Sequence, residues 1–157
     1  LVFADIDPNN WCLDPASVKK KITDRTKAII VVDLFGNMPD MHALVSLSEE
    51  HNIPLVEDAA EALGSKYKGV RAGKFGVGGV HSFHRTKTIA TGEGGVLLLD
   101  DDELFERAKF LRDHGRSTEI AYFTLEATPK YMPSNLQAAM AWAQFQRIDE
   151  LVNRNEV

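Results

Sequence analysis

Cysteine is nearly absent from this chain of 157 residues, in which Cys12 is the only one. A single thiol cannot close an intrachain disulfide and is too few for a structural zinc site. We therefore expect a reducing, cytoplasmic setting. Long apolar runs are also missing, and no stretch approaches the length that crosses a bilayer. We expect no association with a membrane.

An excess of charge of either sign is lacking as well. The chain has 18 Lys and Arg residues against 23 Asp and Glu residues, for a formal net charge of −5. So mild a negative charge offers nucleic acid no electrostatic surface, and we expect no nucleic-acid partner. The hydrophobic share of 44% and the charged share of 26% are those of a globular protein.

The start of the chain has no initiator Met and none of the features of a secretory signal peptide. Its first residues, Leu1–Ile6 (LVFADI), predict a strand. A strand at the first residue indicates either that the true N-terminus has been removed or that the chain is a piece of a longer protein.

A strand–helix–strand unit is predicted in the first third of the chain. The β-branched run Ala28–Asp33 is typical of a strand that is buried on both faces. Asp40 is a suitable N-cap for a helix that closes at His51-Asn52, and Ile53–Val56 predicts a second strand. Because the whole unit takes about thirty residues, we expect a parallel pair of strands.

Further along, the many glycines between residues 64 and 79 favour short strands and tight turns over a helix. Two more strands and two more helices are predicted: Val80–Phe83, Gly95–Leu99, a helix from Asp101 or Asp102 to about His114, and one long helix from Ser134 to about Asn153. The fold class is therefore α/β, with a central, mostly parallel but mixed sheet flanked by helices.

Ligands of open α/β sheets bind beyond the carboxyl ends of the strands, so residues there are candidates for a site. Asp58 lies just past one predicted strand, where a carboxylate can hold a cationic ring nitrogen, a ribose hydroxyl or a metal. The alternative interpretation of Asp58 is a solvated turn residue or the cap of a short helix.

Ser82 and Lys87 form a second candidate group, at the end of another predicted strand and in the loop that follows it. A serine there can donate to a phosphate, and a desolvated lysine can form a Schiff base. The alternative for Lys87 is an ordinary surface lysine. Its neighbours His81, His84 and Arg85 leave open whether they contact a ligand or only pack at the rim.

Other kinds of site find no support in the motifs. The five histidines show no metal-ligand spacing, and we expect no metal site. No Gly-x-Ser-x-Gly elbow is present, which argues against a serine hydrolase. The run Gly92–Gly95 lacks the patterns of nucleotide-binding loops and indicates a turn into a strand.

Three stretches in order carry a resemblance to a known family: Val56–Ala62 (VEDAAEA), Ser82–Lys87 (SFHRTK) and Thr91–Gly95 (TGEGG). Together they resemble the DegT-type sugar-nucleotide aminotransferases, which are fold-type I enzymes that use pyridoxal 5′-phosphate (PLP). The resemblance covers essentially the whole chain and looks most similar to the perosamine synthase branch. It implies that residues 1–157 form the central part of the PLP-binding large domain, without its N-terminal segment and without the C-terminal small domain.

The resemblance also implies roles for four residues. Lys87 corresponds to the lysine that holds PLP as an internal aldimine and later moves a proton. Asp58 corresponds to the carboxylate that pairs with the pyridine nitrogen, and Ser82 to a donor to the cofactor phosphate. Glu61 lies where relatives usually place Gln or His against the cofactor ring. Asp33 stands where the family usually has His, a substitution that we expect to be tolerated.

The implied activity is transfer of an amino group, with glutamate as the expected donor, onto a nucleotide-linked 4-keto-6-deoxy sugar in a homodimer. Two alternatives remain open. One is a sugar dehydratase of the same family, although those enzymes replace the lysine by histidine, whereas Lys87 is present here. The other is a non-catalytic fragment or a regulatory relative that keeps the fold without the activity.

Overall fold

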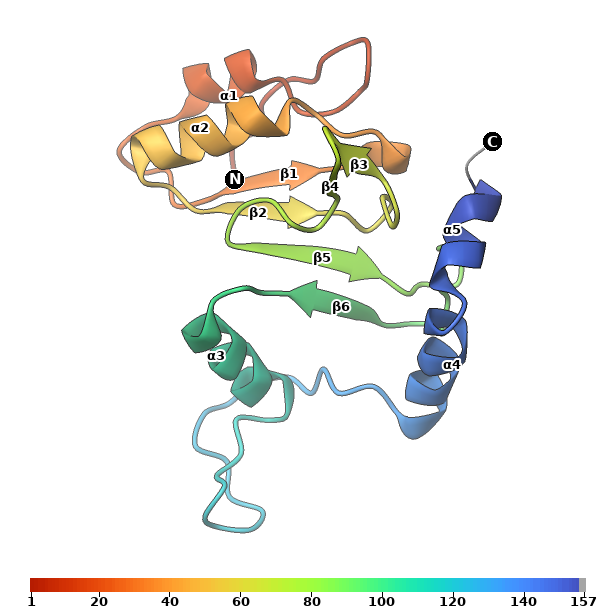
Figure 1. Cartoon of the computed structure of the whole chain (residues 1–157). Helices are drawn as coiled ribbons and strands as arrows, with labels where there is room; N and C mark the ends of the chain where they lie inside the picture. The colour runs from red at the N-terminus through yellow and green to blue at the C-terminus, as the bar shows by residue number, and fades with distance from the viewer. Residues whose placement is uncertain (156–157) are drawn as a thin grey trace.

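The fold is built on a four-stranded sheet in the order β1-β2-β5-β6, seen in a computed structural model that describes residues 1–155 (Figure 1). Strands β1 (Ile29–Val32), β2 (Leu55–Asp58) and β5 (Gly78–Ser82) are parallel, and β6 (Gly95–Leu98) runs antiparallel to β5. The predicted mostly parallel, mixed sheet is confirmed.

Helix α2 (Met41–His51) connects β1 to β2 and completes the predicted unit. Asp40 Oδ1 accepts the Ala43 amide at 3.0 Å, and the helix ends at Asn52 in the left-handed region (φ 51°). Strand β2 begins two residues later than predicted. Pro54 has no N–H to donate to a ladder, which explains the later start.

Helix α1 (Pro15–Lys21), which the sequence analysis did not predict, packs beside α2. Its N-cap is Asp14, whose carboxylate accepts the amides of Ala16 and Ser17. The two helices cover one face of β1 and β2 and bury the main core with them: Val18, Ile29, Val31, Met41, Leu44, Leu47, Ile53, Leu55 and Phe75. This core fixes the strand ends from which the site is built.

The glycine-rich region forms the predicted short strands, β3 (Lys66–Tyr67) and β4 (Val70–Arg71), which pair as a hairpin. Gly76 then turns the chain into β5 with φ +74°, and a Cβ on it would lie 2.1 Å from Leu55 O. Glycine adopts this positive φ without strain, and only glycine permits this close approach of the two backbones.

Three helices follow the sheet: α3 (Asp102–Arg112), α4 (Asn135–Phe145) and α5 (Ile148–Asn155). The Ser134–Gln137 capping box of α4 is confirmed. The prediction of one long helix to about Asn153 is wrong, because the helix stops at Phe145 and restarts as α5. The new direction places Val152 against Gly64, where an added Cβ would lie 2.4 Å from Val152 Cγ1.

The predicted strand at Leu1–Ile6 is also wrong. This stretch forms no strand, and only an isolated bridge joins Ile6 to Leu13. Leu1, Val2 and Phe3 are exposed. A strand needs a neighbour to satisfy its ladder of amides and carbonyls, and the described part of the chain supplies none here.

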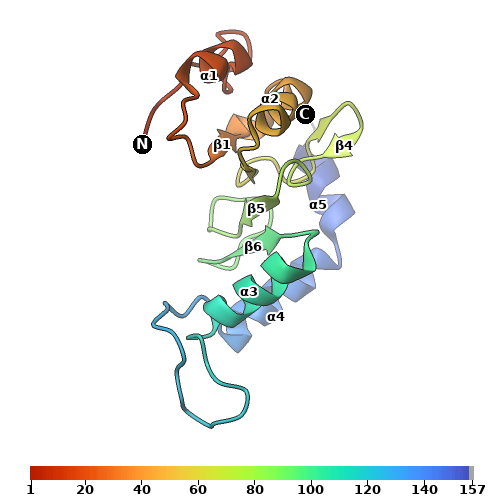
Figure 2. The ribbon, with the colours of Figure 1, turned by 90° about the vertical axis from the view of Figure 1, so that its left-hand side faces the viewer.

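The two views place the elements consistently. Helices α1 and α2 lie at one end of the molecule, and the long loop between α3 and α4 projects from the other (Figures 1 and 2). The tips of β1, β2 and β5 point to the side where α4 and α5 stand (Figure 1). Within residues 1–155, no helix is long and apolar enough to cross a membrane.

Candidate active site

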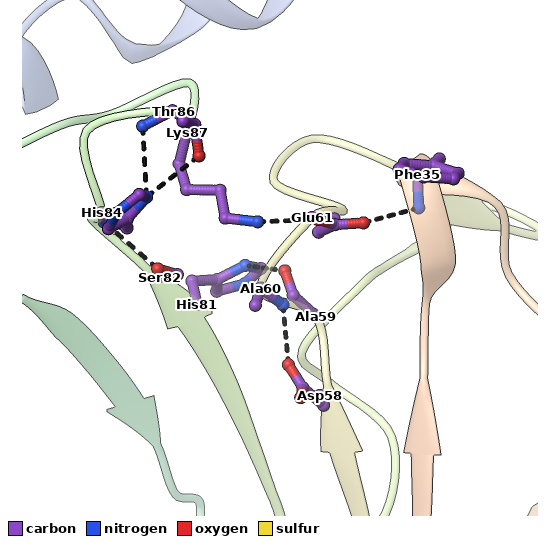
Figure 3. A network of polar contacts seen from close by, with 10 residues as sticks. All are labelled: Phe35, Asp58, Ala59, Ala60, Glu61, His81, Ser82, His84, Thr86 and Lys87. Atoms are coloured by element: carbon purple, nitrogen blue, oxygen red, sulfur yellow. Dashed lines mark hydrogen bonds and ion pairs between the residues drawn. The ribbon is translucent and has the colours of Figure 1, made fainter.

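Asp58 and Ser82 occupy the carboxyl ends of neighbouring strands, as Figure 3 shows. Asp58 is the register partner of Val80 in the parallel pair, so Asp58, Val80 and Ser82 share one face of the sheet. Asp58 Oδ1 accepts the Ala60 amide at 3.1 Å, which orients the carboxylate at the strand end. Both side chains are half-buried.

Lys87 reaches back over these strand ends and pairs with Glu61, with 2.8 Å between Nζ and Oε1 (Figure 3). The side chain of Lys87 is 20% exposed and that of Glu61 is 31% exposed. Lys87 is therefore no ordinary surface lysine, because its side chain is mostly buried and its amine is held by a carboxylate.

The Glu61 carboxylate is also held by a backbone amide of the turn that follows β1. The Phe35 amide donates to Glu61 Oε2 at 3.0 Å. Phe35 lies in a short 3-10 turn (Leu34–Gly36) and has φ 53°, in the left-handed region. The Lys87 ammonium first and the Phe35 amide second keep the pKa of Glu61 below its usual value.

The loop that carries Lys87 is braced by its own backbone and by Ser82. The His84 amide donates to Ser82 Oγ at 3.1 Å, and the Lys87 amide donates to His84 O at 2.9 Å. The Ser82 oxygen thus accepts from the loop, and its hydroxyl proton stays available for an acceptor. The Gly92–Gly95 run forms the predicted turn, since the Phe83 amide donates to Gly94 O and β6 begins at Gly95.

Helix α4 holds the same loop from outside. Gln144 Oε1 accepts the Ala90 amide at 3.0 Å, and Gln144 Nε2 donates to Ala90 O at 2.7 Å. About two turns earlier in the helix, Gln137 Nε2 donates to Glu93 O at 2.9 Å. These side-chain hydrogen bonds span 54 and 44 residues, and they hold α4 against the lysine loop, the segment 83–94 that carries Lys87.

The two histidines that flank Ser82 have different positions. His81 is buried, and its Nδ1 lies 3.0 Å from Ala59 O, so it is a core residue that joins β5 to the segment after β2. His84 lies at the rim with its Nδ1 3.0 Å from Thr86 Oγ1. Arg85 is exposed.

Beneath the site lie two acids without exposure to solvent, Asp33 and Glu57. Glu57 Oε2 accepts the Phe75 amide at 2.8 Å. Glu57 Oε1 and both oxygens of Asp33 are buried without a hydrogen-bond partner. Burial first, and then the neighbouring carboxyl group of Glu57, raise the pKa of Asp33 to about 8.

The structure brings Lys87 and Glu61 into contact and places Asp58 and Ser82 at the adjoining strand ends. The sequence analysis missed Phe35, because a backbone amide leaves no mark in the residue type. It missed Gln144 because the partner lies 54 residues away. Asp33 was noted only as a variant, since its burial beside Glu57 depends on the sheet register. No group of three or more His, Cys, Asp or Glu suited to a metal occurs in the described residues.

Comparison with solved structures defines the class of protein as a fold-type I PLP enzyme. PseC of Helicobacter pylori, an aminotransferase involved in pseudoaminic acid biosynthesis, matches with a TM-score of 0.89 and 31% identity, over 95% of this chain and 40% of PseC. A GDP-4-keto-6-deoxy-D-mannose-3-dehydratase of E. coli with bound hydrated PLP matches with a TM-score of 0.85 and 29% identity, over 94% of this chain and 42% of the enzyme.

The chain belongs to the DegT/DnrJ/EryC1/StrS aminotransferase family, whose profile matches residues 1–157. It is 39% identical over 149 residues to the GDP-perosamine synthase of Caulobacter vibrioides, covering 95% of this chain and 40% of the synthase. The resemblance inferred from the sequence is confirmed, and with it PLP as the cofactor of the family. The chain spans about 40% of the length of the relatives it matches.

The residues present fit PLP. The cofactor needs an amine for its aldehyde, an anion for its protonated ring nitrogen and donors for its phosphate. Lys87 offers a largely shielded amine, Asp58 an oriented carboxylate and Ser82 an available hydroxyl proton, all at the ends of neighbouring strands or in the loop above them.

Proposed function

We propose that the protein containing this chain is a PLP-dependent aminotransferase that moves an amino group onto a nucleotide-linked 4-keto-6-deoxy sugar. The observation that carries the proposal is the shielded Lys87 amine above Asp58 and Ser82, in a chain of the DegT/DnrJ/EryC1/StrS family. Glutamate is the proposed amino donor. The 39% identity to a GDP-perosamine synthase supports a GDP-linked sugar as acceptor.

Each proposed site residue has a task that its surroundings support. Bound PLP supplies the reactive aldehyde and a ring that accepts electrons. Asp58 holds the ring nitrogen in its protonated form through a charge-assisted hydrogen bond, and the Ala60 amide keeps that carboxylate in place. Ser82 donates to the phosphate.

Lys87 both anchors the cofactor and moves a proton at Nζ. Its amine must leave Glu61 before it can act as a nucleophile or base, because an ammonium in an ion pair has no free electron pair. Glu61 would then remain anchored by the Phe35 amide. Its carboxylate can receive the ammonium again after the proton has moved.

We also propose that the chain forms the central part of the large domain, in a homodimer that works in the reducing cytoplasm. The 40% coverage of the relatives supports the first point. Many large apolar side chains on β6, α3 and α4 are exposed, which supports further contacts in the full protein: Val96, Leu97, Leu104, Phe105, Leu136, Met140, Trp142 and Phe145.

The experiment that tests the function uses the full-length protein. PLP is added, the adduct is reduced with borohydride, and the modified peptide is located by mass spectrometry. We expect the label on Lys87. The Lys87→Ala variant is expected to lose amino transfer from glutamate to a keto sugar by at least about three orders of magnitude.

Lys74→Ala is the matched control, because Lys74 is also ion-paired at 2.8 Å, with Asp100, at the other end of β5. It is expected to retain labelling and activity. Label on another residue, or an adduct that persists in Lys87→Ala, would contradict the proposed role. Deoxygenation of the sugar in place of amination would favour the family's dehydratase activity, against which the Lys87 amine argues.

A further inference from the structure

Asp33 and Glu57 lie on the core face of the sheet, opposite to Asp58. Val31 is the register partner of Glu57, and Asp33 follows Val31 by two residues, so the three share a face. The Asp33 amide continues the ladder by donating to Asp58 O at 3.0 Å. Both acids have an exposure of 0%, whereas Val32, which precedes Asp33 on β1 and pairs with Asp58, is 42% exposed on the other face.

Nothing in their surroundings compensates two negative charges. Three of the four carboxyl oxygens have no donor within reach, and none of the ion pairs among residues 1–155 involves either acid. The other titratable groups close by are Asp58, which is a third acid, and the buried thiol of Cys12. Two buried carboxylates side by side cannot both ionise without such compensation.

A single proton removes the conflict. A protonated Asp33 becomes a donor, and Glu57 lies within hydrogen-bonding reach of it. Glu57 stays the acceptor, since its Oε2 already takes the Phe75 amide. The proton therefore links the end of β1 to β2 and, through Phe75, to the turn before β5.

The hydrogen bond between Asp33 and Glu57 lies directly before a strained turn. Asp33 is the residue before the 3-10 turn Leu34–Gly36, and its side chain does not cap that turn. Phe35 within the turn is held at φ 53°, which a non-glycine residue adopts only when its surroundings enforce it. The amide of this same residue binds Glu61, which holds Lys87.

We propose that Asp33 and Glu57 share one proton, and that the resulting hydrogen bond positions Lys87 by holding the root of the turn whose Phe35 amide binds Glu61. Both acids are positioning residues, because neither touches Lys87. The consequence for catalysis rests on the proposed function, whereas the shared proton and the placement of the amine do not.

The shared proton makes the stability of the folded protein depend on pH with a definite sign. The unfolded chain releases the Asp33 proton near the ordinary pKa of 3.8, and the folded chain keeps it to about 8. Between these values the folded state binds more protons, so the stability falls as the pH rises and levels off above the folded pKa. Loss of the proton also places two like charges at the root of the turn, which releases Glu61 and Lys87.

The first measurement is the unfolding midpoint of the full-length protein between about pH 6 and about pH 9. In Asp33→Asn the amide donates to Glu57 at every pH, so the part of the profile that comes from the pair disappears. Below about pH 8 we expect the original protein to lose at least about 2 °C per pH unit relative to Asp33→Asn, and above that pH we expect the difference to stop growing. Asp24→Asn, at an exposed position, is the control and is expected to follow the original protein.

Glu57→Gln is a second variant for the case that Asp33→Asn does not fold. Its amide can donate to Asp33 while its oxygen keeps the Phe75 amide, and the same flattening is expected. Parallel profiles for the original protein and the variant that folds would overturn the shared proton.

The second measurement follows Lys87 itself before PLP is added. Acetylation of Lys87 is compared with that of Lys74 in the same sample by mass spectrometry, because both amines are ion-paired at 2.8 Å. The ratio is expected to rise at least about twofold above pH 8 in the original protein and to stay level in Asp33→Asn. A level ratio in both would overturn the positioning role, whatever the outcome of the PLP labelling.

Discussion

Glu61 is the residue through which the polar contacts of the site converge. One carboxylate oxygen holds the Lys87 ammonium, and the other holds the Phe35 amide. This arrangement keeps the amine at the rim in the absence of a ligand. The ion pair also keeps the Lys87 amine from reacting, because an ammonium must lose its partner and its proton before it attacks an aldehyde.

The residue-scale prediction is that Glu61→Gln speeds the capture of PLP. The glutamine side chain can still accept the Phe35 amide, but it removes the charge that holds Lys87. Half-buried ion pairs of this kind are worth about 0.5–1 kcal/mol, so we expect the rate of adduct formation to rise about two- to fivefold. Stopped-flow absorbance with PLP measures this rate.

Glu93→Gln is the control for that change. Glu93 is an exposed acid of the same loop, 3.9 Å from His84 Nε2, and does not contact Lys87. An equal acceleration in both variants would show that net charge at the rim, and not the ion pair, controls the amine. A slower capture in Glu61→Gln would contradict the role given to Glu61.

Among the elements, α4 has the closest connection to the site. It begins at a capping box and presents Gln137 and Gln144 to the two arms of the lysine loop. The loop backbone between them includes Ile89 and Thr91, which are buried. A buried backbone amide without a partner costs free energy, so the loss of Gln144 destabilises the protein more than the loss of an ordinary exposed glutamine.

The element-scale prediction concerns Gln144→Leu, which removes both bonds to Ala90 at nearly constant size. We expect the free energy of unfolding to fall by about 1–3 kcal/mol and the Ala90 amide to exchange its hydrogen faster. Hydrogen-exchange mass spectrometry checks the loop, and thermal unfolding checks the whole protein.

Gln146→Leu is the matched variant, at an exposed position just beyond the same helix. It is expected to leave exchange in the loop unchanged. If both variants exchange alike, α4 does not hold the lysine loop through Gln144.

At the scale of the whole molecule, the sheet has one covered and one uncovered face. Helices α1 and α2 bury Ile29 and Val31, whereas Ile30, Val32 and Leu97 on the opposite face are 61%, 42% and 49% exposed. The uncovered face is the one that carries Asp58. An apolar surface of this kind is typical of a face that meets another layer.

We therefore expect Ile30→Lys to improve the solution behaviour of the isolated chain and to destabilise the full-length protein. In the isolated 157-residue chain the added charge reduces self-association, as measured by light scattering. In the full-length protein it lowers the free energy of unfolding by about 2 kcal/mol or more, because a lysine is buried without a partner.

Val70→Lys, on the exposed hairpin strand β4, is the control and is expected to be nearly neutral in both forms. A neutral effect of Ile30→Lys in the full-length protein would contradict a covered sheet face.

Local chemistry made part of this fold and site predictable. The Asp40 cap and the Ser134–Gln137 box mark their helices within four residues. The apolar runs of β1 and β6 mark strands, and the positions of Asp58, Ser82 and Lys87 follow from the strand ends. The strand expected at Leu1–Ile6 failed because a strand depends on a neighbour.

The sequence by itself determined the family, the strand–helix–strand unit from β1 to β2 and the residues that stand at the strand ends, because these depend on residue type and short spacing. Only the tertiary structure decided that Lys87 meets Glu61, that Gln144 meets Ala90 and that Asp33 is buried beside Glu57. Those contacts join residues 24 to 54 positions apart. Which of them meet is set by sheet register and helix packing, and no local pattern encodes either.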